Sequence, residues 1–71
     1  MKKTRKGFQK ALKKNNLSIY KLAKALNIGK PIAYHWLWGD TVPSLQNLIK
    51  LKTILNVSGD EILEMFAEEA T

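Results

Sequence analysis

Residues that could catalyse a reaction or bind a metal are few in this sequence. There is no cysteine and a single histidine, His35, so neither a disulfide framework nor a structural zinc site is expected. Five of the six acids lie between Asp60 and Glu69, where the pattern indicates a solvated helix face. Since His35 has no acid within its own predicted helix, general acid–base catalysis is not indicated. The sequence therefore argues against an enzyme and predicts no metal, no cofactor and no small-molecule ligand.

Basic side chains provide most of the chemistry that the sequence does carry. Residues 1–30 contain ten Lys or Arg and no acid, a charge of +10, whereas residues 31–71 contain two lysines and six acids, a charge of −4. The net charge of +6 therefore comes from one end of the chain. Such an asymmetry suits a protein that meets a polyanion on one side. Charge alone leaves the alternative that lysine-rich helices are simply well solvated.

Apolar and small residues between Leu17 and Trp38 have the spacing that two short helices crossing through a tight turn require. The buried positions of this unit would be Ile19, Leu22, Ala23, Leu26, Ile28, Ala33 and Trp36. Ala23 is small, as a close helix crossing demands. Asn27 stands where the first of these helices must end on a left-handed residue, a conformation that Asn tolerates. The spacing predicts a helix-turn-helix.

Capping residues define the limits of these two helices. Ser18 is a good N-cap for a helix that should end near Leu26. Lys30 and Pro31 fall in the first turn of the second helix, where the missing Pro amide costs nothing, and Gly39 would end it as a left-handed cap.

Three further helices are predicted around this unit. The first should run from about Thr4, its cap, to Asn15. Pro43 and Ser44 open another helix, and a capping box beginning at Ser58 starts a last helix over about 59–67. The expected core stripe of the fourth helix is Leu45, Leu48, Leu51, Ile54 and Leu55.

These elements predict one all-α domain of five helices over residues 1–71, with residues 1–3 as a basic arm and residues 68–71 as a frayed end. No apolar run approaches the ~18 residues of a membrane span, so a cytoplasmic protein with no membrane partner is expected. A chain this short buries only about 60% of its unfolded surface, which favours a dimer.

With these residues the sequence resembles the phage repressor and Cro-like helix-turn-helix family, over roughly Thr4 to Phe66. The resemblance continues into Trp36–Leu45 and the segment ending at Ser58. It implies a compact lambda-repressor-like DNA-binding domain whose second motif helix, the recognition helix, enters the major groove. It also implies a sequence-specific transcriptional regulator of a bacterial or phage-infected cell, a Cro-like repressor that binds a palindromic double-stranded operator as a homodimer. An antitoxin or adaptor that uses the same fold for protein–protein interaction stays open, although the acid-free first 39 residues weigh against it.

Four residues are expected to face the base edges. The family reads bases with the first, second and sixth residues of the recognition helix, which correspond here to Lys30, Pro31 and His35. Tyr34 shares the same arc. Lys30 can donate to guanine, Pro31 and Tyr34 can contact a thymine methyl group, and His35 can donate to guanine or phosphate with its tautomer undetermined.

Phosphate contacts and a dimer interface are expected at other positions. The phosphate-contacting set is Ser18, Tyr20, Lys21, Lys24, Trp38 and Thr41, with Lys2, Lys3 and Arg5 from the N-terminal arm. For Trp38, packing under the following loop is an equal alternative. The last helix has more apolar residues than one buried stripe needs, so a dimer interface is expected there. Its residues are Ile62, Leu63, Met65 and Phe66.

Three features depart from the family pattern. Ile19 replaces a Gln that contacts a phosphate and supports the first recognition residue, a role that Tyr20 or the main chain would have to take. Leu12 and Leu37 stand where many members bury an Arg–Glu pair, and are expected to pack together instead. The loop at Asp40–Pro43 is acidic where many relatives are basic, which leaves a threonine and main-chain donors for phosphate.

Overall fold

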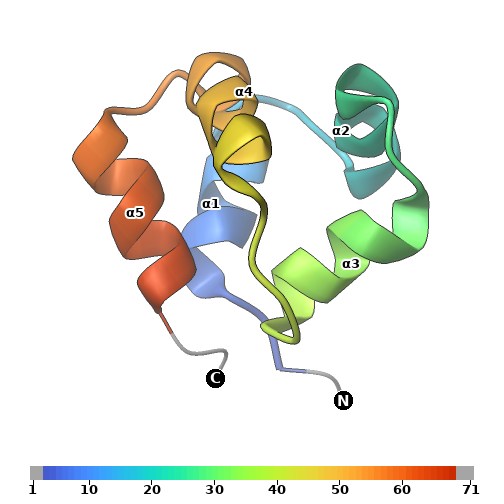
Figure 1. Ribbon diagram of the computed structural model, residues 1–71, viewed down its shortest axis with the longest axis horizontal. Coiled ribbons are helices and arrows are strands. Elements are labelled where there is room, and N and C mark those ends of the chain that lie inside the picture. Colours follow the sequence, from blue (N-terminus) through green and yellow to red (C-terminus); the bar gives the residue numbers. More distant parts are fainter. Residues whose placement is uncertain (1–2, 69–71) are drawn as a thin grey trace.

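A computed structural model describes residues 3–68, which form five helices and no strand. The helices are α1 (Lys6–Lys14), α2 (Ile19–Leu26), α3 (Lys30–Trp38), α4 (Leu45–Leu55) and α5 (Gly59–Ala67). Figure 1 shows α2 and α3 together on one side of the molecule and α5 on the opposite side. Within residues 3–68, no helix is long and apolar enough to span a membrane. The all-α architecture and the limits of α5 are as the sequence predicts.

Serine side chains start three of the helices. Ser18, Ser44 and Ser58 each accept a hydrogen bond from the amide three residues later, at 3.1, 3.3 and 3.1 Å. Ser58 also donates its own amide to Glu61 Oε1 at 3.3 Å, which completes the predicted capping box.

Left-handed residues end the first four helices. Asn16, Asn27 and Asn56 have φ values of 55°, 57° and 54°, and Gly39 has 85°. In each case the amide of the following residue reaches back five residues to a helical carbonyl, as in Ile28 N–H to Ala23 O at 3.0 Å. This is the Schellman arrangement, which satisfies carbonyls that a helix end would otherwise expose. The chain therefore reverses sharply between consecutive short helices.

One apolar cluster holds the helices together. All seven residues of the predicted motif contribute, six fully buried and Ile28 partly buried. Leu12 and Leu37 are both buried in the same cluster. Leu51 and Leu55 of α4 are buried as predicted, but Leu45 is 72% exposed, so its assignment to the core was wrong. Leu45 is the first residue of α4, and its side chain lies at the rim of a groove between α4 and α5 and outside the core.

Most of the predicted dimer interface belongs to this core. Ile62, Met65 and Phe66 are buried within the single chain, and Phe66 packs against Phe8 with ring centroids 5.1 Å apart. The assignment of Met65 and Phe66 to an interface was therefore wrong, because α1 and α4 already cover that side of α5. Ile62 is buried too, but it also lines a groove between α4 and α5. Only Leu63 of the four is exposed.

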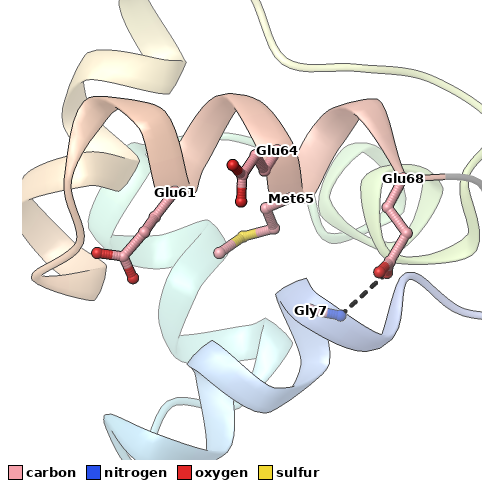
Figure 2. Close-up of a pocket in the computed structure, with 5 residues that line it drawn as sticks. All are labelled: Gly7, Glu61, Glu64, Met65 and Glu68. Carbon is pink, nitrogen blue, oxygen red and sulfur yellow. Dashed lines mark hydrogen bonds between the residues drawn. The ribbon is translucent and has the colours of Figure 1, made fainter.

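The start of α1 is capped from another helix. The N-cap residue is Arg5, not Thr4, and its side chain makes no capping bond. Instead Glu68, just after α5, accepts the Gly7 amide at 3.1 Å through Oε1, in a small pocket also lined by Glu61, Glu64 and Met65 (Figure 2). A carboxylate at a helix N-terminus opposes the helix dipole favourably. Glu68 is thus a structural residue, where the sequence indicated only a solvated acidic face.

The left-handed cap after α3 gives a test of this architecture. Gly39→Ala forces a Cβ into the left-handed region and is expected to lower the free energy of unfolding by about 1–2 kcal/mol. Gly59→Ala is the matched control, because a Cβ there meets nothing within 4 Å and its φ is not positive. It should leave stability unchanged or raise it by about 0.4–1 kcal/mol. Urea unfolding measures both, and equal stabilities for the two variants would contradict the role of Gly39.

Candidate nucleic-acid interface

The turn between α2 and α3 brings the two helices into close crossing. Asn27 ends α2 in the left-handed region, Gly29 is the N-cap of α3, and Pro31 lies in its first turn. Ala23 and Ala33 are both buried where the helices meet. The small side chains permit the close approach that the sequence indicated, and α3 is held across the end of α2 (Figure 1).

One face of α3 stays open to solvent. Lys30, Pro31, Tyr34 and His35, the four predicted base-reading residues, are all exposed, whereas Ala33, Trp36 and Leu37 are buried. At 3.6 residues per turn, Pro31 and His35 lie one turn apart on the same side. Ile32 is also 48% exposed and was missed by the sequence reasoning. Ile32 is not one of the buried positions of the helix-turn-helix motif, and this alone could have predicted its exposure.

Lys30 is supported by an aromatic ring from α2. Its Nζ lies 4.6 Å from the centroid of the Tyr20 ring, a cation–π contact that limits where the ammonium group can go. Ile19 is buried and contributes to the core, so it cannot support a recognition residue. Tyr20 therefore contacts Lys30, the first residue of α3. Tyr20 was one of two candidates, with the main chain, for the supporting role of the missing Gln.

Aromatic rings cover the second half of α3. Tyr34 and Trp38 have ring centroids 5.2 Å apart, and His35 meets Trp38 edge-on at 5.8 Å. Trp38 is partly buried and packs against the apolar cluster. Trp38 thus contacts the core, while a phosphate contact by its indole stays a prediction.

His35 has an acidic partner just beyond its helix. Asp40 Oδ2 lies 2.9 Å from His35 Nδ1, and both side chains are about half exposed. The main chain enforces this pairing, since Asp40 N–H donates to His35 O at 3.0 Å and Thr41 N–H approaches the same oxygen at 3.4 Å. These two amides therefore already have an acceptor at the helix end, and phosphate contact by the Thr41 side chain stays a prediction.

A comparison with family profiles identifies the chain. A profile described as helix-turn-helix matches residues 8–62, which is most of the sequence. The chain belongs to the Cro/C1-type helix-turn-helix family. Neither the curated proteins nor the solved structures compared with it contain a match.

Membership of the Cro/C1-type family fixes the class of protein. This is a family of DNA-binding regulatory domains and not of enzymes, so the chain is a DNA-binding transcriptional regulator whose partner is double-stranded DNA. Its five helices form the all-α lambda-repressor-like fold, with α2 and α3 as the helix-turn-helix.

Arg5 serves the fold and was wrongly assigned to a phosphate-contacting arm. It is only 5% exposed. Its Nη1 donates to Trp36 O at 2.8 Å and to Thr41 O at 2.7 Å, and its Nε donates to Glu68 O at 3.2 Å. The guanidinium also lies 5.3 Å from the Phe66 ring centroid. Arg5 thus joins the end of α3 to the end of α5.

Burial and nearby carboxylates act in opposite directions on the pKa of this arginine. Desolvation lowers the pKa of Arg5, while the negative charges of Asp40 and Glu68 act in the opposite direction and raise it. Many Cro/C1-type proteins use an Arg–Glu pair to tie helix 1 to helix 3. Here Leu12 and Leu37 occupy those positions, and Arg5 binds main-chain carbonyls at the end of α3 instead.

The remaining phosphate candidates are at the surface. Lys3, Ser18, Tyr20, Lys21, Lys24 and Thr41 are all exposed. The Ser18 hydroxyl accepts from the Lys21 amide, so it is already used as a helix cap but keeps its own proton to donate. Lys2 lies outside the described residues.

Arg5→Ala is expected to lower the free energy of unfolding by about 2–4 kcal/mol, because the buried Trp36 carbonyl and the part-buried Thr41 carbonyl lose a charged donor. The neighbouring Lys6 is exposed and carries the same charge, so Lys6→Ala should change stability by no more than about 0.5 kcal/mol. Urea unfolding of both variants makes the comparison. An unchanged midpoint for Arg5→Ala, with weaker DNA binding, would restore the phosphate-contacting role.

Proposed function

We propose that this protein is a sequence-specific repressor that binds a palindromic operator as a homodimer, with α3 in the major groove. The observation that carries the proposal is the exposed face of α3, on which Lys30, Pro31, Tyr34 and His35 lie together. The groove admits one α-helix, and the N-terminal half of such a helix meets the base edges. A repressor of this kind acts by occupying its operator.

The residues on this face offer chemically distinct contacts. Lys30, held over Tyr20, can donate to guanine O6 and N7. Pro31, Ile32 and Tyr34 are exposed apolar surfaces that suit a thymine methyl group. A face that combines a donor with apolar groups can discriminate between bases, whereas a uniformly basic face would bind phosphate alone.

Affinity is expected to come chiefly from phosphates. Lys21 and Lys24 are exposed on α2, next to the recognition helix, and no acid occurs in the first 39 residues. Each phosphate neutralised by such a side chain releases counterions, so binding should weaken steeply as salt rises.

Selection from a random duplex pool at near-physiological salt tests the proposal. The protein should enrich a palindrome with half-sites about one helical turn apart. Lys30→Ala and His35→Ala should each relax the preference at one base position per half-site, by about 1–3 kcal/mol. Lys50→Ala, which removes an exposed lysine from α4, should keep the preferred sequence and provides the control. Weak, salt-sensitive binding without enrichment would instead favour the protein-interaction alternative.

The dimer contact is proposed at a groove between α4 and α5. Leu48 and Ile62 line the groove, and three exposed residues surround it: Leu45 at 72%, Ile49 at 59% and Leu63 at 60%. We call these three residues the α4–α5 patch. Of the interface residues expected from the sequence, Leu63 alone belongs to it.

A second copy of the chain fits the α4–α5 patch. Among residues 3–68, Lys52 is the only charged residue that lines the groove, so two such surfaces can meet around a two-fold axis without strong repulsion. The α2 and α3 surfaces carry lysines, which would repel their own copy. The patch draws no residue from α2 or α3, and contact through it leaves the recognition helix free for DNA.

Leu63→Glu should convert the dimer to a monomer and weaken binding to the full palindrome, because it would place two carboxylates against each other in an apolar contact. Val42→Glu is a matched control, since Val42 is equally exposed at 60% but lies in the loop before α4. Sedimentation equilibrium measures the mass of each variant. If Leu63→Glu keeps the wild-type mass, the dimer contact lies elsewhere.

A further inference from the structure

The contact between His35 and Asp40 affects which base His35 can bind, if α3 reads DNA as proposed above. The imidazole has two nitrogens, and only Nδ1 faces the Asp40 carboxylate, at 2.9 Å. An ionised carboxylate can only accept hydrogen bonds, so Nδ1 must carry a proton to satisfy this contact. In neutral imidazole the other nitrogen, Nε2, is then unprotonated and acts as an acceptor.

The pairing is built into the main chain. Gly39, at φ 85°, turns the chain back at the end of α3, and the Asp40 amide binds His35 O at 3.0 Å. Asp40 is therefore brought alongside the imidazole by the same cap that ends the helix. The Trp38 ring meets the imidazole edge-on at 5.8 Å, which restricts its rotation further.

Acceptors and donors in the major groove identify different bases. A side-chain acceptor pairs with the exocyclic amino group of cytosine or adenine, whereas guanine presents the acceptors N7 and O6 on its edge. A neutral histidine whose remaining nitrogen is an acceptor should therefore favour cytosine or adenine and disfavour guanine at the position it meets.

We propose that Asp40 is a positioning residue that determines the base read by His35: by holding the proton on Nδ1, it presents Nε2 to an amino group of cytosine or adenine. This also accounts for an acidic loop beside the DNA-reading face. The negative charge that would repel phosphate is engaged by the recognition helix itself.

The tautomer can be measured without DNA. His35 is the only histidine, so the ¹⁵N shifts of one imidazole report both nitrogens unambiguously. At a pH of about 8, above the ordinary titration range of histidine, wild-type protein should show the Nδ1–H form. Asp40→Asn should show a mixture or the Nε2–H form, because an amide can either donate or accept. A predominant Nε2–H form in the wild type would overturn the inference.

Base preference supplies the second measurement. On the selected operator, Asp40→Asn should reduce the discrimination against guanine at the His35 position by about tenfold and leave the other positions unchanged. Asp60→Asn removes the same charge from α5 and should change no preference. In an His35→Ala background, Asp40→Asn should have no further effect on base choice.

These experiments distinguish a failure of the proposed function from a failure of the role proposed for Asp40. If wild-type protein shows no sequence preference, the proposed function fails and the inference fails with it. If the protein is selective but Asp40→Asn alters affinity equally for all bases, or still changes base choice without His35, only the inference is overturned. Urea unfolding of Asp40→Asn verifies that the variant is folded.

Discussion

Left-handed residues at the ends of four short helices are the constraint on which this structure depends. Helices of 8–11 residues are marginal alone and are stable here only because each packs on the others. The chain reverses direction immediately after each of the first four helices, at Asn16, Asn27, Gly39 and Asn56. The apolar faces of the helices therefore converge on one cluster. The cap at Asn27 determines how α3 crosses α2, and the cap at Gly39 places Asp40 beside His35.

Interactions at the end of α3 connect the fold to the DNA-binding face. Arg5 binds carbonyls at this end and also reaches the end of α5, while Glu68 caps α1. Both ends of the described chain therefore support α3, the proposed recognition helix. The Arg5 and Glu68 side chains make their hydrogen bonds within the chain, whereas the lysines of α2 and α3 in this Cro/C1-type regulator are exposed.

The two surfaces proposed to bind DNA and a second copy of the chain are physically distinct. The DNA-reading face combines a lysine, a histidine and apolar groups on α3, supported by Tyr20 from α2. The α4–α5 patch is apolar, and Lys52 is the one charged residue among the described ones that line the groove beside it. This separation would allow the proposed dimer to form without obstructing contact between α3 and DNA.

Local chemistry made much of the fold predictable, since helix caps, left-handed asparagines and apolar spacing act between residues close in sequence. Asn27, Gly39 and the Ser58 capping box are confirmed for this reason, as is burial of the seven motif residues. The placement of Arg5, the cap from Glu68 and the burial of Ile62, Met65 and Phe66 depend on neighbours far away in the chain. Periodicity shows that a side chain is apolar or charged, but only the tertiary structure decides which helix covers it and which distant carbonyl it meets.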